Sequence, residues 1–62
     1  MASPIRLSII GSTGSIGEST LRVVDRYPHR LRVVGLAAGR NQHRLIEQME
    51  RYRPEIAALG ED

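Results

Sequence analysis

The sequence predicts an α/β protein with a parallel sheet, built in the order strand, helix, strand, helix, strand. Three short apolar runs alternate with two segments whose apolar residues recur at helical spacing. The connections between them are short and are marked by glycine, proline or asparagine. The first connection is the most informative part of the chain, with the sequence Gly11-Ser12-Thr13-Gly14-Ser15-Ile16-Gly17.

The first strand is expected over Ile5–Ile10, which alternates apolar and polar residues and then becomes fully apolar. This pattern fits a parallel strand whose inner end is buried on both faces. A turn follows at Gly11–Gly14. Ser15 and Glu18 have the spacing of a capping box, in which the Ser hydroxyl and the Glu carboxylate satisfy the first amides of a helix.

The first helix is expected to end at Pro28, because proline disfavours helical geometry in the residue before it. We expect its apolar stripe to comprise Ile16, Leu21, Val23, Val24 and Tyr27.

A second strand is expected over Leu31–Ala38, which is rich in branched residues and ends before Gly39. Asn41 is a good N-cap for a second helix that stops at Pro54. The apolar positions expected on this helix are Leu45, Ile46, Met49 and Tyr52. A third strand over Ile56–Leu59 and a loop over Gly60-Glu61-Asp62 complete the chain.

This order predicts right-handed crossovers and a Rossmann-like parallel sheet, the first β-α-β-α-β half of a doubly wound nucleotide-binding fold. The 62 residues are fewer than a complete dinucleotide-binding domain needs. A chain this short buries only ~60% of its unfolded surface. We therefore expect residues 1–62 to be the N-terminal portion of a larger nucleotide-binding domain, with the remainder of the parent protein absent.

Composition disfavours several other classes of protein. The chain has no cysteine and only two histidines, so neither a disulfide nor a structural zinc site is expected. All nine basic residues are arginines, but they are scattered among seven acidic residues, and the chain has only two aromatic residues. This pattern disfavours nucleic-acid binding. No apolar run approaches the ~20 residues of a membrane span, so a cytoplasmic protein is expected.

The glycine turn has the features of a site for a diphosphate. We assign Gly11 to the tight exit from the strand, Gly14 to the place where the diphosphate approaches, and Gly17 to close packing of helix against strand. Thr13 and Ser15 can add hydroxyl donors, and the amides of Gly14, Ser15 and Ile16 are expected to face the phosphate. A Walker loop is excluded, because no Gly-Lys-Ser/Thr follows. The alternative is a turn that merely links strand to helix.

The end of the second strand bears on cofactor choice. NAD-type folds place an acidic residue ~20 residues beyond the glycines to bind the ribose 2′-hydroxyl. Here that region reads Gly39-Arg40-Asn41, without an acid. Arg40 can pair with a 2′-phosphate, which favours NADP over NAD. Alternatively, Arg40 is a solvated charge and Asn41 only a helix cap; we expect the neighbouring His43 and Arg44 to be exposed.

The turn, together with Ser19-Thr20-Leu21, Val23-Val24 and Val33-Val34-Gly35-Leu36-Ala37-Ala38-Gly39-Arg40-Asn41, resembles the N-terminus of the 1-deoxy-D-xylulose 5-phosphate reductoisomerases. The resemblance implies an NADPH-dependent enzyme that also uses a divalent metal (magnesium, manganese or cobalt), acts on a phosphorylated sugar and forms a homodimer. It places Thr13, Gly14, Ser15 and Ile16 at the diphosphate and Gly39, Arg40 and Asn41 on the adenosine side. The family's metal and substrate residues would lie beyond Asp62, and Glu18 departs from the small or neutral residue expected after the motif.

Two alternatives remain open at this point. One is another NADP-dependent dehydrogenase of small metabolites, of the aspartate-semialdehyde or homoserine type. The other is a small arginine-rich protein that binds nucleic acid.

Overall fold

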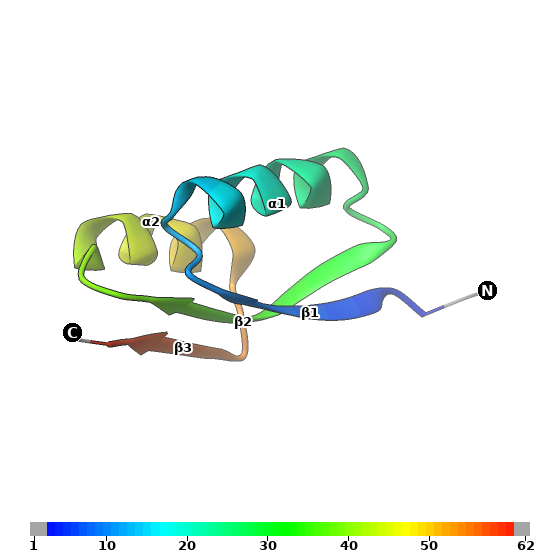
Figure 1. The fold of residues 1–62 in the computed structure, drawn as a ribbon. Helices are drawn as coiled ribbons and strands as arrows, with labels where there is room; N and C mark the ends of the chain where they lie inside the picture. Colours follow the sequence, from blue (N-terminus) through cyan, green and yellow to red (C-terminus); the bar gives the residue numbers. More distant parts are fainter. Residues whose placement is uncertain (1–2, 61–62) are drawn as a thin grey trace.

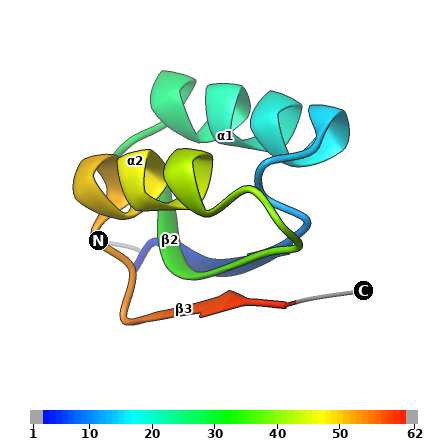
Figure 2. The ribbon, with the colours of Figure 1, turned by 90° about the vertical axis from the view of Figure 1, so that its left-hand side faces the viewer.

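The computed structural model describes residues 3–60, which form three parallel strands and two helices. The elements are β1 (Ile5–Ile10), α1 (Ser15–Arg26), β2 (Leu31–Ala38), α2 (Gln42–Tyr52) and β3 (Ile56–Leu59). The strand order is β1-β2-β3, so β2 is central. Both helices lie on the same face of the sheet (Figures 1 and 2). The predicted fold class is therefore confirmed: this is a Rossmann-like β-α-β-α-β half.

The core lies between that sheet face and the two helices. It consists of seven buried apolar residues: Ile9, Leu21, Val24, Val33, Leu36, Ala38 and Leu45. These residues come from β1, α1, β2 and α2, which are far apart in the sequence. Their packing holds the end of β1 beside the end of β2. Ile10 pairs with Ala37 in the parallel register of these two strands.

The start of α1 differs from the prediction. Gly14 is the N-cap, with no side chain bonded to the first turn, and Ser15 is already helical. The predicted capping box between Ser15 and Glu18 is therefore wrong. Its physical reason is that Glu18 has a stronger partner, the guanidinium of Arg44 on α2.

The other helix ends agree with the sequence. The last residue of α1 is Arg26, two residues before Pro28. Asn41 caps α2, because its Oδ1 accepts from the Arg44 amide at 3.1 Å. The helix ends at Tyr52, and its C-cap Arg53 lies in the left-handed region, at φ 49°, directly before Pro54. Gly60 donates its amide to the Ala38 carbonyl, and residues 61 and 62 of the expected loop lie outside the described residues.

The predicted apolar stripes are partly wrong. On α1, the buried residues are Gly17, Leu21 and Val24, whereas Ile16, Val23 and Tyr27 are exposed. On α2, Leu45 is buried as expected and Tyr52 packs against the core, but Ile46 and Met49 are exposed. The exposed residues lie on the flanks of the two helices. The sheet contacts only one side of each helix, so a narrow stripe is buried.

Candidate functional site

The glycine turn is tied to the end of β2. Gly11 has a φ of 77°, a left-handed conformation that favours glycine, and it turns the chain sharply out of β1. The amides of Gly11 and Ser12 both donate to the Ala37 carbonyl, at 2.7 and 2.9 Å. The turn therefore sits against the strand end that leads into Gly39. Two separate stretches of sequence meet at the carboxyl edge of the sheet.

Several amides of this turn have no internal acceptor. Among residues 3–60, the N–H groups of Thr13, Ser15 and Ile16 make no hydrogen bond. The Gly14 amide differs from our expectation, because it donates to the Gly11 carbonyl at 3.0 Å. A ligand at this helix N-terminus would thus meet the amides of Ser15 and Ile16, but not that of Gly14.

Gly17 and Gly14 lack side chains for different reasons. A Cβ at Gly17 would lie 2.2 Å from the Gly11 carbonyl oxygen and 2.7 Å from the Ser12 Cα. The predicted close packing is therefore present, but it brings α1 against the turn that follows β1 and not against the strand itself. A Cβ at Gly14 would meet only the Gly11 oxygen, at 3.4 Å. Its backbone, with φ −80°, is open to any residue. Internal packing therefore does not explain the glycine at position 14.

The second half of the site follows β2. Gly39, Arg40 and Asn41 are exposed. The Arg40 carbonyl accepts from the Gln42 amide at 2.8 Å, and Asn41 caps α2. None of the ion pairs between described residues involves the Arg40 guanidinium. This cation is thus available beside the start of α2.

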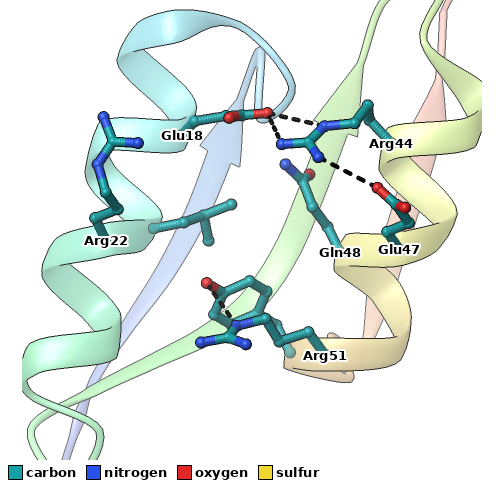
Figure 3. A pocket seen from close by; sticks show the side chains of 8 residues that line it. Glu18, Arg22, Arg44, Glu47, Gln48 and Arg51 are labelled. Atoms are coloured by element: carbon teal, nitrogen blue, oxygen red, sulfur yellow. Dashed lines mark hydrogen bonds and ion pairs between the residues drawn. The ribbon is translucent and has the colours of Figure 1, made fainter.

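Glu18 is held by α2 (Figure 3). The Arg44 Nε lies 3.1 Å from Glu18 Oε2, its Nη2 also contacts that oxygen, and its Nη1 lies 3.3 Å from Glu47 Oε1. The hydrogen bond and the charge of Glu18 raise the pKa of Arg44 above its ordinary value, with a smaller contribution from Glu47. The Glu18 carboxylate, whose negative charge would repel an anion at the turn, is therefore paired with the Arg44 cation.

A second link joins the two helices further along. The Tyr52 hydroxyl donates to Asp25 Oδ1 at 2.9 Å, and Arg51 contacts both the Tyr52 hydroxyl and the Asp25 carboxylate. Burial raises the pKa of Tyr52, and the hydrogen bond to Asp25 adds to this. The hollow between α1 and α2 in Figure 3 is lined by the first link and by Arg51 and Tyr52 of the second, and it lies between the helices and not at the strand ends.

The structure places the predicted site residues in two groups. Thr13 is half-buried, and the other six are exposed: Gly14, Ser15, Ile16, Gly39, Arg40 and Asn41. The two groups meet through the bonds of the turn to Ala37. Sequence reasoning missed Gln48, which is buried and donates from Nε2 to the Ser12 carbonyl at 2.8 Å. Its position three residues after Leu45, on the buried face of α2, was the available signal.

Among the described residues, no group of three acidic or histidine side chains could hold a metal ion. His43 and Arg44 are exposed, as expected. No helix within residues 3–60 is long and apolar enough to cross a membrane.

The fold and the glycine turn at the carboxyl edge of its sheet define the class: the first half of a Rossmann-like α/β protein. Comparison with known proteins gives the family. Residues 7–62 match the family described as 1-deoxy-D-xylulose 5-phosphate reductoisomerase, and the chain belongs to it.

Three relatives illustrate the match. The reductoisomerase of Thermosynechococcus vestitus is 56% identical over 55 residues, which is 89% of this chain and 13% of the relative. That of Anaeromyxobacter sp. strain K is 54% identical over 57 residues, covering 92% of this chain and 15% of the relative. That of Synechococcus sp. strain ATCC 27144 is 57% identical over 53 residues, covering 86% and 13%. The chain thus spans about one seventh of the length of these relatives.

Family membership favours a reductoisomerase over the aspartate-semialdehyde and homoserine dehydrogenases considered from the sequence.

Proposed function

We propose that residues 1–62 are the N-terminal portion of the NADPH-binding domain of a 1-deoxy-D-xylulose 5-phosphate reductoisomerase. The observation that carries the proposal is that amides and a cation without partners within residues 3–60 lie at one edge of the sheet. Ser15 and Ile16 offer N–H groups at the start of α1, and Arg40 offers a guanidinium at the end of β2.

The turn suits a diphosphate. The dipole of the 12-residue helix α1 favours negative charge at its N-terminus. Thr13 and Ser15 add hydroxyl groups, and Gly14 leaves room for a phosphate to approach the main chain. Pairing of Glu18 with Arg44 removes most of the repulsion that an acidic first turn would otherwise cause.

The segment after β2 suits an adenosine with a 2′-phosphate. Arg40 can form charge-assisted hydrogen bonds to that phosphate, whereas a carboxylate in its place would repel it. Gly39 and Asn41 border the same place. Asn41 keeps its cap on α2 while its exposed position leaves it beside the ligand.

When bound, NADPH would supply the hydride, and the described residues would hold and orient the cofactor. In the whole protein, the reaction would rearrange 1-deoxy-D-xylulose 5-phosphate and reduce the resulting aldehyde to 2-C-methyl-D-erythritol 4-phosphate. The divalent metal, magnesium, manganese or cobalt, would be bound by residues beyond this chain, since residues 3–60 offer no ligand cluster. A cytoplasmic homodimer is part of the same proposal.

The test is a fluorescence titration of the full-length protein with NADPH and, separately, with NADH. Arg40→Ala is expected to weaken the binding of NADPH by ~1–3 kcal/mol, the size of a lost hydrogen bond to a charged group, and to weaken the binding of NADH much less. Arg32→Ala is the matched control, because Arg32 is an exposed arginine toward the opposite end of β2. Equal losses for both cofactors in Arg40→Ala would contradict the role in 2′-phosphate binding.

A DNA oligomer titrated against the same protein tests the alternative reading of the nine arginines. The proposal expects NADPH binding without DNA binding. The reverse result would overturn the enzyme assignment.

A further inference from the structure

Gln48 is a buried polar residue that connects α2 to the glycine turn. Its side chain is part of the buried face of α2, with 7% of the residue exposed. The amide Nε2 donates to the main-chain carbonyl of Ser12 at 2.8 Å, across 36 positions of sequence. Ser12 itself has no exposed surface. Figure 3 shows Gln48 pointing from α2 toward the side of α1 and the turn.

We propose that Gln48 is a positioning residue for the cofactor: it orients the Thr13 amide toward the diphosphate. The inference rests on the proposed function and deepens it, because it concerns the same site.

The orientation follows from peptide geometry. A trans peptide unit is planar, and its C=O and N–H groups point in opposite directions. No peptide bond among the described residues is cis. The Ser12 carbonyl and the Thr13 amide belong to one such unit. Because Gln48 binds the carbonyl on the side of α2, the Thr13 N–H points away from α2.

That amide is one of the free donors of the turn, since it has no acceptor within residues 3–60. The other bonds of the turn do not fix this peptide. Gly11 and Ser12 donate to Ala37, and Gly14 donates to Gly11, so these bonds hold the neighbouring peptide units. Gln48 supplies the remaining constraint.

Burial makes this constraint strict. The Ser12 carbonyl is shielded together with its residue, so loss of Gln48 Nε2 would leave an acceptor without a partner. The peptide could then regain a partner only by rotating. Two further atoms here, Ser12 Oγ and Gln48 Oε1, already lack partners among the described residues. An apolar side chain at position 48 would remove one of these unpaired atoms, which offsets part of the folding cost and isolates the effect on the turn.

Gln48→Met in the full-length protein tests the inference, because methionine keeps the approximate size and removes the donor. We expect the dissociation constants of NADPH and NADH to rise together by about tenfold, since the diphosphate is common to both and each 1.4 kcal/mol is a factor of ten. This pattern differs from that of Arg40→Ala, which separates the two cofactors. Gln48→Asn, which keeps the amide but shortens its reach by one methylene, is expected to fall between Gln48→Met and the wild type.

Leu45→Ala is the matched control, because Leu45 is a buried core residue on the same helix and its side chain cannot hydrogen-bond the turn. It is expected to lower the melting temperature at least as much as Gln48→Met, yet to leave the affinity of the folded protein near that of the wild type. Unchanged affinity in Gln48→Met would overturn the inference. So would an equal loss of affinity in Leu45→Ala, which would reduce Gln48 to a structural role.

Failure of the proposed function is recognised separately. If the wild-type protein binds neither NADPH nor NADH, the site assignment itself is wrong, and the positioning role falls with it. If the wild type binds both cofactors and the Gln48 variants bind them with the same affinity, the site assignment stands and only the positioning role is rejected.

Discussion

The two glycines that flank the start of α1 should respond in opposite ways to the same substitution. Gly17→Ala places a methyl group 2.2 Å from the Gly11 oxygen, 2.7 Å from the Ser12 Cα and 2.9 Å from the Ser12 carbonyl carbon. All three are main-chain atoms, so no side chain can rotate away. Gly14→Ala places its methyl group 3.4 Å from the nearest atom, in an ordinary backbone conformation.

The magnitudes follow from these distances. For Gly17→Ala, α1 must move away from the turn by about 1 Å to restore ordinary contact, and overpacking of this kind costs ~1–3 kcal/mol or more. Because the obstacle is backbone, we expect the upper end, about 3 kcal/mol. Gly14→Ala should leave the free energy of unfolding unchanged or raise it by up to ~1 kcal/mol, because alanine restricts the unfolded chain. The same variant should lose affinity for NADPH and NADH alike.

Hydrogen exchange, read on peptides from residues 3–60 of the full-length protein, measures the free energy of local opening. Fluorescence titration measures cofactor affinity in parallel. The reasoning is refuted if Gly17→Ala exchanges as slowly as the wild type. It is also refuted if Gly14→Ala loses stability but keeps its affinity, since the two glycines would then have exchanged roles.

Three further predictions concern the contacts around the site. Tyr52→Phe should cost about 1 kcal/mol at neutral pH through the lost hydrogen bond to Asp25. The folded-state pKa of Tyr52 is raised above 10.0, so the contribution of Tyr52 to stability is present at neutral pH and is lost as the pH rises through that pKa. In urea unfolding, the free energy of unfolding should therefore change less between pH 7 and pH 11 in Tyr52→Phe than in the wild type. Arg53→Gly should stabilise the fold by about 1 kcal/mol in the same assay, because it relieves the left-handed backbone after α2; a destabilised variant would contradict this. Arg44→Met should weaken NADPH and NADH a few-fold by leaving Glu18 unpaired, and Glu18→Gln in the same chain should restore the affinity; no recovery in titrations of the double variant would show that the ion pair does not shield the turn.

The order and ends of the elements could be predicted because short-range signals determine them. The stop of α1 before Pro28 and the cap of Asn41 on α2 depend on residues a few positions apart. The tight exit at Gly11 and the close packing at Gly17 are local as well. Neighbouring residues in the sequence determine these features, and the structure confirms them.

The partners of Glu18 and Gln48 could not be predicted in the same way. Glu18 lies three residues after Ser15, which is the spacing of a capping box, but its carboxylate bonds Arg44, 26 positions away. Only the packing of α1 beside α2 brings these two charges together, and a charged partner outcompetes a neutral amide. For the same reason, the periodicity of α2 could indicate that Gln48 is buried but not that its amide bonds the turn.

Helix α2 connects the two halves of the candidate site. The turn is recognised from local sequence, yet two contacts from elsewhere constrain its geometry, those with the Ala37 carbonyl and the Gln48 amide. A third contact, from the Arg44 guanidinium, holds Glu18 in the first turn of α1. The contacts of Gln48 and Arg44 come from α2, which begins at Gln42, two residues after Arg40, and is capped by Asn41. In the proposed site, a cofactor bound at Arg40 would lie beside the start of the helix that contacts the turn. Binding at the adenosine end and at the diphosphate end should be coupled through α2, so variants at Arg40 and Gln48 should show non-additive losses of NADPH affinity in a double-mutant cycle. Strict additivity would mean that α2 is only a rigid support.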